Sequence, residues 1–216
     1  MNLPILHDFR WCYIGEAKPG MDKKQKTAND AMLDWKSLRL ITFSILATVA
    51  LSSESATADD WQNCNQVRNS NKAVNACTRL IDEQSTKGRR RTVAYANRCL
   101  AHAYGSQFKL ALDDCDAAIE RDPKLVFALN ARCWVRIELS EPNGAVQDCN
   151  RAIGLDRKHF WAHVNRGVAR QKMGQHALAL DDYSKAIRIN PKQALTYSNR
   201  CHIRILMKQY DLAWAD

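Results

Sequence analysis

The chain has 216 residues and a formal net charge of +9, from 32 Lys and Arg against 23 Asp and Glu. Such a basic balance would suit nucleic acid. Anionic surfaces or acidic segments of a partner protein are the alternatives. The sequence contains no Gly-rich phosphate loop, no nucleophile elbow and no His-Glu-x-x-His helix. These absences argue against an enzyme, so we expect neither catalytic residues nor a cofactor.

Residues 36–58 have the order of regions found in a secretory signal peptide. Two basic residues precede an apolar run from Leu40 to Leu51, and small residues lead to Ala58. This order predicts cleavage after Ala58, and the apolar run is too short to span a bilayer comfortably. The alternatives are an uncleaved membrane anchor and an apolar stretch without a targeting role.

The position of this signal favours a later translation start. A secretory signal belongs at the start of a chain, and Met32 lies four residues before Lys36. We therefore expect residues 1–31 to be a non-native extension, residues 32–58 to be the signal peptide and Asp59 to begin the mature protein. The expected location is periplasmic or secreted, without a stable membrane span after cleavage. A membrane-anchored or cytoplasmic location is the alternative.

Residues 59–91 are predicted to form a short, atypical helix pair followed by a connector. The segment 72–81 aligns with the later segment 144–153, which indicates a second helix preceded by a first helix that starts near Trp61. A polar and basic connector, residues 84–91, follows. We expect this pair to cap a stack of repeats, because the ends of a solenoid need a modified unit with a polar outer face.

A pattern of fixed period fills the rest of the chain. The tripeptide Asn97-Arg98-Cys99 returns in the same or a related form at residues 131, 165 and 199, and alanine and aspartate follow it each time at fixed distances. A fixed period of this length indicates an array of small units, none of which buries its own apolar face. The function is therefore expected on the surface of the stack, not in a pocket.

Each unit is predicted to contain two helices. In the first unit, residues 92–105 and 108–121 carry apolar residues at helical spacing. A short polar turn near Gly105 joins them, and Gly144 and Gly174 lie near the corresponding turns. A short connection makes the two helices antiparallel, so the expected fold is an all-α solenoid of antiparallel helix pairs.

The unit resembles the tetratricopeptide repeat, a helix-turn-helix of about 34 residues. Cys99, Ala111 and Ala118 are small residues at places where the helices of that family touch, and Phe108 is the aromatic residue expected after the turn. The chain is similar, more narrowly, to the secreted, cysteine-containing tetratricopeptide proteins of Gram-negative bacteria. The repeats implied by this resemblance are residues 92–125, 126–159, 160–193 and a truncated fourth unit, 194–216.

A few positions depart from the family pattern. Pro142 and His176 replace the aromatic residue after the turn, and Arg157 replaces a closing proline. Asp216 falls within the second helix of the fourth unit, which indicates a fragment or a truncated reading frame. The remaining stub is too short to be a stable helix by itself, so we expect this unit to fray and to expose apolar surface.

In tetratricopeptide proteins the first helices line a concave face, and the resemblance places large side chains there. Aromatic side chains are good anchors for a peptide or a helix, although packing between units is the alternative. The lysine-and-asparagine clamp of some chaperone-binding relatives is not reproduced, because Ala96 occupies one of its cationic or amide positions and Leu100 the other. The expected partner-binding residues are Leu100, Tyr104, Phe127, Trp134, Trp161, Val168 and His202.

The cysteines recur at equivalent positions of first and second helices, which face each other in an antiparallel pair. Each bridge would close a loop of roughly 15 residues, worth on the order of 3 kcal/mol in the chain-entropy model. Buried free thiols that pack as small hydrophobic groups are the alternative. A redox or metal role is disfavoured because the sequence contains no Cys-x-x-Cys. The expected pairs are Cys64 with Cys77, Cys99 with Cys115, and Cys133 with Cys149.

Arginine and aspartate form two ladders with the same period, exemplified by Arg98 and Asp114. Their shared period favours ion pairs between helices, whereas an anion-binding arginine stripe is the alternative. His159 and His163 have the spacing of two metal ligands on a helix, but no third ligand lies nearby in the sequence. We interpret them as ordinary surface or groove histidines and expect no metal site.

These patterns together predict an exported module that binds a protein or peptide and acts as an adaptor or assembly factor in a bacterial cell envelope. The alternative is a cytosolic or membrane-anchored regulatory scaffold with reduced cysteines. Nucleic-acid binding would need the basic residues to gather on one exposed face. The ladder pairing argues against that arrangement, and export argues against nucleic acid and favours anionic envelope surfaces or acidic partner segments. Nucleic acid is therefore not an expected partner.

Overall fold

The computed structural model describes residues 58–216. The expected amino-terminal extension and the expected signal peptide up to residue 57 lie outside these residues. The described part consists of helices and contains no strand, and none of its helices combines the length and hydrophobicity needed to cross a membrane. The helices are α1 (Ala58–Asn65), α2 (Ser70–Asp82), α3 (Arg89–Tyr104), α4 (Phe108–Arg121), α5 (Val126–Glu138), α6 (Pro142–Leu155), α7 (Phe160–Lys172), α8 (His176–Ile189), α9 (Ala194–Leu206) and α10 (Tyr210–Trp214).

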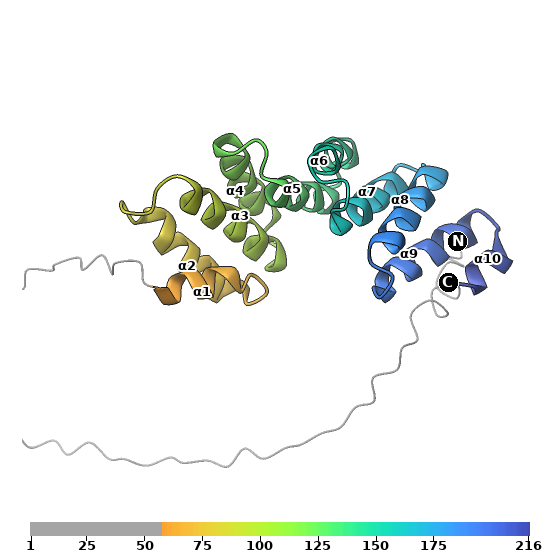
Figure 1. Ribbon diagram of the computed structural model, residues 1–216, viewed down its shortest axis with the longest axis horizontal. Helices are drawn as coiled ribbons and strands as arrows, with labels where there is room; N and C mark the ends of the chain where they lie inside the picture. The colour runs from red at the N-terminus through yellow and green to blue at the C-terminus, as the bar shows by residue number, and fades with distance from the viewer. Residues whose placement is uncertain (1–57) are drawn as a thin grey trace, which may run out of the picture.

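The helices follow one another in pairs along a curved row, as Figure 1 shows, which confirms the predicted all-α solenoid. Each first helix packs on the second helix of its own unit, and each second helix packs on the first helix of the next unit. The first helices α3, α5 and α7 also contact one another in succession. The second helices α4, α6 and α8 are separated by the first helix that lies between them. The first helices therefore form the inner layer of the curve and the second helices the outer layer.

Small side chains allow the helices of a unit to approach closely. Ala111 and Ala118 of α4 are fully buried, as are the alanines at the equivalent places of α6 and α8. One apolar cluster joins Ala96 and Ala118 of the first repeat to Ala152 and Ala162 of the next two. Because the clusters cross the boundaries between repeats, each unit depends on its neighbours for its core.

The turn inside each unit contains one residue in the left-handed conformation. This residue is Ser106, Ser140, Gly174 or Lys208, with φ of 59°, 61°, 71° and 58°. Gly174 therefore lies in its turn as expected. Gly144 lies near its turn, as predicted, in the first helical turn of α6, where it packs against the side chain of Arg136.

The amino-terminal cap is formed by α1 and α2, in agreement with the aligned segment, but its connector is shorter than predicted. Helix α3 begins at Arg89, so Arg89, Arg90 and Arg91 are helical. Basic residues at a helix amino terminus are disfavoured by the helix dipole. Here the guanidinium of Arg90 lies over the ring of Trp61, and Arg91 donates to the carbonyl oxygen of Glu83 at 2.9 Å. These contacts with the cap explain the earlier start.

The missing closing proline does not disturb the end of the second repeat. The side-chain oxygen of the residue that caps each second helix accepts the backbone N–H two residues later, at 3.0 Å for Asp122, 3.0 Å for Asp156 and 3.2 Å for Asn190. Such turns form without proline. Arg157 therefore follows Asp156 without a change in the local structure.

The last helix, α10, has 5 residues. Apolar side chains on it are open to solvent, and Trp214 is 79% exposed. The fourth unit therefore exposes apolar surface, as expected, and its fraying stays a prediction.

Candidate functional site

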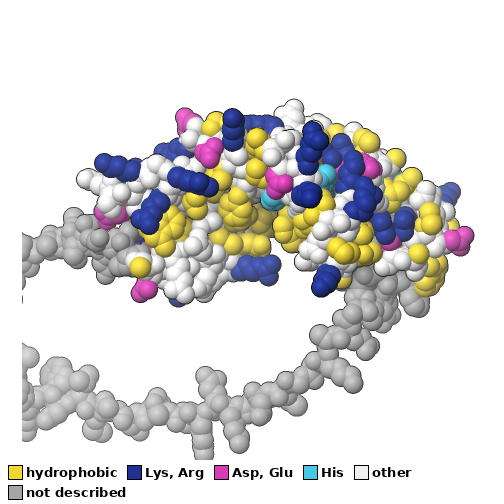
Figure 2. Space-filling view, viewed as in Figure 1, with side chains coloured by type: hydrophobic (Ala, Val, Ile, Leu, Met, Phe, Trp, Pro, Cys, Tyr) yellow, Lys and Arg dark blue, Asp and Glu magenta, His cyan; other side chains and the backbone are white. Residues whose placement is uncertain are grey.

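Three aromatic side chains of the first helices are open to solvent. Tyr104 at the end of α3 is 44% exposed, Phe127 near the start of α5 is 39% exposed, and Trp161 near the start of α7 is 43% exposed. Figure 2 shows hydrophobic side chains along the hollow of the curve. Three of the seven expected partner-binding residues are therefore accessible on consecutive first helices.

Two aromatic pairs strengthen this surface. The rings of Tyr104 and Trp134 lie 5.1 Å apart and connect α3 with α5. Trp134 is half-buried, and its indole Nε1 donates to Glu138 at 3.2 Å. Phe160 packs edge-on against Trp161 at 5.0 Å. Trp134 thus serves packing between repeats as well as the surface, whereas Trp161 is the more available ring.

The other expected residues lie mainly in the packing between helices. Leu100 packs against the apolar cluster around Cys99, and Val168 contacts the clusters on both sides of α7. His202 is half-buried, and burial, aided by the neighbouring His176, lowers the pKa of its ring. These three side chains offer less surface to a partner than the aromatic residues do.

Sequence reasoning missed Arg68. This arginine lies in the turn between α1 and α2, outside the repeated pattern, and its guanidinium is placed over the ring of Tyr104 at 5.9 Å. The contact brings a cation to the edge of the aromatic surface. The repeat pattern does not extend to the atypical cap unit. It therefore gave no signal for this arginine.

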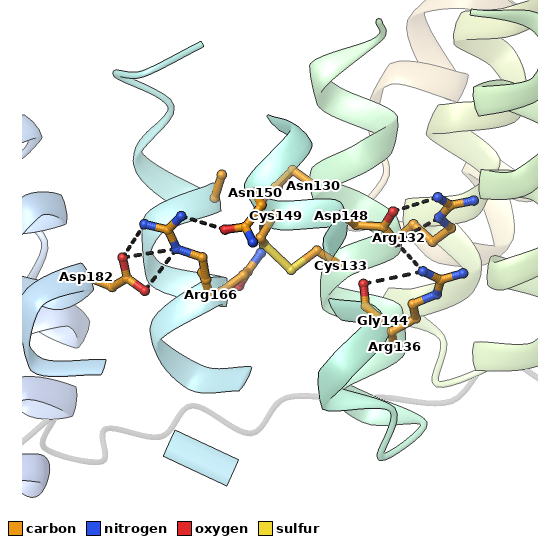
Figure 3. The surroundings of a disulfide bond; sticks show 12 residues. Asn130, Arg132, Cys133, Arg136, Gly144, Asp148, Cys149, Asn150, Arg166 and Asp182 are labelled. Carbon is orange, nitrogen blue, oxygen red and sulfur yellow. Dashed lines mark hydrogen bonds and ion pairs between the residues drawn. A yellow bond between two sulfur atoms is a disulfide. The ribbon is translucent and has the colours of Figure 1, made fainter. Parts of the chain in front are cut away.

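The arginine ladder is fully engaged in ion pairs and hydrogen bonds. Arg98 donates to both carboxylate oxygens of Asp114, at 2.8 Å and 2.7 Å, and reaches back to the hydroxyl of Thr78 in the preceding unit at 3.0 Å. This confirms the predicted pairing between helices, and the arginines do not form a free anion-binding stripe. The same arrangement recurs for Arg132, Arg166 and Arg200, with Asp148, Asp182 and Asp216 in their own units and Asp116, Asn150 and Ser184 in the preceding ones. Figure 3 shows Arg132 with Asp148, and Arg166 with Asp182 and Asn150.

Three aspartates of the ladder, Asp114, Asp148 and Asp182, are buried, and Asp182 is held as a carboxylate. Burial raises the pKa of Asp182, but the ring of His163, whose Nδ1 atom lies 3.8 Å from the carboxylate, the hydrogen bonds from Arg166 and the charge of Arg170 outweigh burial, so that the pKa of Asp182 lies below its ordinary value. A buried carboxylate held in this way keeps its charge at neutral pH. The ladder is therefore a structural network, not a set of free acid or base groups.

All three expected disulfides are present, Cys64–Cys77, Cys99–Cys115 and Cys133–Cys149. Each joins the first and second helix of one unit, and all six cysteines are fully buried. Figure 3 shows Cys133–Cys149 between two rungs of the ladder. In the third repeat Gly167 and Tyr183 occupy the equivalent positions and are also buried.

The comparison with known families agrees with this geometry. Residues 160–193 match the family model of the tetratricopeptide repeat, which are the bounds expected for the third unit. The fold is the tetratricopeptide-repeat solenoid. Among curated proteins no sequence matches the chain.

Solved tetratricopeptide-repeat structures resemble the described region in fold. The first tetratricopeptide domain of Spaghetti (RPAP3) bound to the HSP90 peptide SRMEEVD is 20% identical, with a TM-score of 0.53 over 54% of this chain and 93% of that one. The tetratricopeptide domain of Arabidopsis OM64 is 23% identical, with a TM-score of 0.51 over 52% and 93%. The MamA protein is 16% identical, with a TM-score of 0.60 over 74% and 87%.

Two asparagines at equivalent places of the first helices of this tetratricopeptide solenoid are engaged within the stack. Asn97 donates to the side chain of Asn65 at 2.8 Å, and Asn165 donates to that of Asn130 at 3.1 Å. These amides link neighbouring first helices. The side-chain amides of Asn97 and Asn165 are therefore part of the packing between repeats.

The two histidines at helical spacing stabilise the start of α7 in the third tetratricopeptide unit. The Nδ1 atom of His159 accepts the backbone N–H of Ala162 at 3.1 Å and so caps the helix. The Nε2 atom of His163 lies 3.1 Å from the carbonyl oxygen of Arg157. Within residues 58–216, no three His, Cys, Asp or Glu side chains gather in a way that could hold a metal ion.

Proposed function

We propose that the chain is an exported protein-interaction module that binds a peptide or helix of a partner protein on its inner face, as an adaptor or assembly factor. The observation that carries the proposal is the row of exposed aromatic residues Tyr104, Phe127 and Trp161 on successive first helices. Burying such side chains against a partner gains free energy with little loss of conformational entropy.

The structural relatives support binding to protein, and the details of this chain support a different mode of recognition. One similar tetratricopeptide domain is described in complex with an HSP90 peptide. Here the asparagines Asn97 and Asn165 are already hydrogen-bonded to other asparagines. The proposed partner is therefore held mainly by apolar contacts with aromatic side chains, and the module binds without catalysing a reaction.

Paired variants of matched exposure test the inner face. Replacing Phe127 and Trp161 by alanine removes two exposed aromatic side chains from first helices. Replacing Leu110 and Leu178 by alanine removes two exposed apolar side chains, 51% and 47% exposed, from the second helices α4 and α8. Affinity capture from envelope extract should lose its partners with the first double variant and keep them with the second. Equal recovery with both would contradict the proposal.

The disulfides support the export part of the proposal. Disulfides persist in oxidising compartments and are rare in reducing ones, and three join the described helix pairs. A periplasmic or secreted location accounts for them. In a cytosolic or membrane-anchored scaffold, the alternative, the same cysteines would be reduced.

Intact mass spectrometry of the protein from its native host distinguishes these locations. Thiols are alkylated with and without prior reduction. A mass that starts at Asp59, with six cysteines protected until reduction, is the expected result. A mass that retains residues before Ala58, with all thiols alkylated at once, would exclude cleavage and disulfide formation and would favour the intracellular scaffold.

A further inference from the structure

A basic groove opens on the outer layer of the stack, between α6 and α8, with α7 beneath it. Its volume is about 670 Å³. Half-buried Ile153 of α6 and Ile189 of α8 give it an apolar floor. Figure 2 shows Lys and Arg side chains gathered over this part of the molecule. The basic residues that line the groove are Arg157, Lys158, Arg166, Lys185 and Arg188.

The equivalent groove one repeat earlier contains acids that this one lacks. There, Asp116 pairs with Arg132 at 2.6 Å, and Glu120 lies one helical turn further on. At the equivalent positions of the next repeat, Asn150 replaces Asp116 and Gly154 replaces Glu120. The groove between α6 and α8 has thus lost both acidic positions, although the solenoid packs in the same way around each groove.

The same comparison shows added basic residues. Arg157 stands where the earlier repeat has Pro123, and Arg188 stands where it has Gly154. The turn after α6 forms with or without proline, as its capping aspartate shows. The fold therefore does not require either arginine, and their charge needs a different explanation.

Most of this charge is not neutralised by the protein itself. Arg166 is bound by Asp182, and Lys185 pairs with the exposed Asp181 at 2.6 Å. The exposed side chains of Arg157, Lys158 and Arg188 form no ion pair with the residues that the structure describes. Three cations from two segments thus surround an apolar floor.

We propose that this groove binds an acidic segment of a partner protein. Its carboxylates pair with Arg157 and Arg188, because the planar guanidinium group matches a carboxylate with two parallel hydrogen bonds. An apolar side chain between the carboxylates lies on Ile153 and Ile189 and is removed from water. No aromatic side chain is among the described residues lining the groove, so nucleic-acid bases lack a stacking surface there.

The site lies on the opposite layer from the aromatic residues of the inner face. A partner on the inner face and an acidic segment in the groove can therefore be bound at the same time. The inference goes beyond the proposed function and does not depend on it. An adaptor with two such surfaces would connect two proteins.

Fluorescence anisotropy with a labelled peptide tests the groove on the full chain. The probe is Glu-Glu-Leu-Glu-Glu, and its matched neutral form is Gln-Gln-Leu-Gln-Gln. Arg157→Ala/Arg188→Ala should weaken binding of the acidic peptide by about fivefold, since each exposed ion pair contributes a few tenths of a kcal/mol or more. Lys124→Ala/Arg151→Ala, which removes the same charge from the preceding groove, should leave the affinity within about twofold.

Each further outcome decides for or against the groove. Arg157→Lys/Arg188→Lys keeps the charge and should restore part of the binding, whereas Phe127→Ala/Trp161→Ala should not change it. Equal loss in the groove variant and in the Lys124/Arg151 control would mean attraction by net charge alone and would overturn the proposal. So would equal affinity for the neutral peptide. Tighter binding of a single-stranded oligonucleotide through the same two arginines would replace the acidic segment by nucleic acid.

Discussion

The second and third repeats fill the same two positions in different ways. Cys133 and Cys149 form a buried disulfide between α5 and α6. In the third repeat Gly167 faces the ring of Tyr183, and a Cβ atom added to this glycine would lie 2.6 Å from the ring atom Cε1. The second repeat thus fills this space with two cysteine side chains joined by a bond. The third repeat fills it with one large ring beside a glycine. The fold requires this space to be filled and does not require a particular bond.

The two solutions derive their stability from different states of the chain. In the chain-entropy model a disulfide stabilises the fold mainly by restricting the unfolded chain. The glycine and tyrosine stabilise it through close packing and burial in the folded state. Reducing agents should therefore affect the second repeat, whereas changes of side-chain volume should affect the third.

Truncating the tyrosine should give the largest effect. Tyr183 is fully buried, so Tyr183→Ala leaves a cavity and should lower the free energy of unfolding by about 3–5 kcal/mol. Equilibrium unfolding in urea measures the change. The control Tyr183→Phe removes only the hydrogen bond to Gln171, which is 2.9 Å long, and should cost about 1 kcal/mol. Similar costs for both variants would show that burial of the ring is not the main contribution.

Removing the disulfide of the second repeat should cost slightly less. Cys133→Ala/Cys149→Ala opens a loop of roughly 15 residues and should lower the free energy of unfolding by about 3 kcal/mol. Hydrogen exchange should show faster exchange in α5 and α6, and adding a reductant to the wild type should produce the same change there. Faster exchange in α7 and α8 that equals the change in α5 and α6 would contradict the separation of the two repeats.

A single methyl group at the glycine should have an intermediate effect. Gly167→Ala places a Cβ atom against the Tyr183 ring and should cost about 1–3 kcal/mol through overpacking. Gly154→Ala in α6 is the matched control, because nothing lies within 4 Å of its added Cβ. The control should gain up to about 1 kcal/mol of helix propensity. Thermal unfolding should show a lower melting temperature for Gly167→Ala and a higher one for Gly154→Ala. Stabilisation by Gly167→Ala would refute the tight contact with the Tyr183 ring.

The smallest expected effect is a pH dependence at the start of α7. Burial lowers the pKa of the His159 ring below its ordinary value; the charge of His163 adds to this, and that of Asp156 opposes it. The unfolded chain therefore binds the proton more tightly. The contribution of His159 to the free energy of unfolding should be fully present above about pH 6.5. It should be lost as the pH decreases below that value. Hydrogen exchange at the start of α7 measures this loss, and His159→Asn, which retains a capping side chain, should remove most of the dependence.

Most of the fold could be predicted from the repeat period. The ladder and the disulfides were predictable because both connect positions of a helix pair that recur in every repeat, such as Arg98 with Asp114. The start of α3 at Arg89 was not predictable in this way. It depends on contacts of Arg90 and Arg91 with the atypical cap, whose shorter unit has its own spacing.

The candidate site could be predicted only in part. Sequence analysis identified Trp134 and Trp161 as similar members of one face, but the ring of Trp134 packs against Tyr104 while Trp161 stays open. The exposure of each ring depends on the side chains that contact it, and some of these side chains belong to the neighbouring repeat. The basic groove was not predicted for the same reason, because Arg157 and Arg188 belong to different units.

The contacts of the ladder arginines with the preceding unit limit which deletions and insertions the solenoid tolerates. Arg166 reaches Asn150 in the unit before it, and Arg132 reaches Asp116 in the same relation. If residues 126–159 were excised, Arg166 would stand opposite Asp116, an acceptor that already serves an arginine at this position. The ladder would therefore stay complete, whereas Asn165, which donates to Asn130, would stand opposite Ala96 and lose this partner. The chain can thus be shortened or lengthened by whole repeats, and a cut of any other length would leave a guanidinium group without its acceptor.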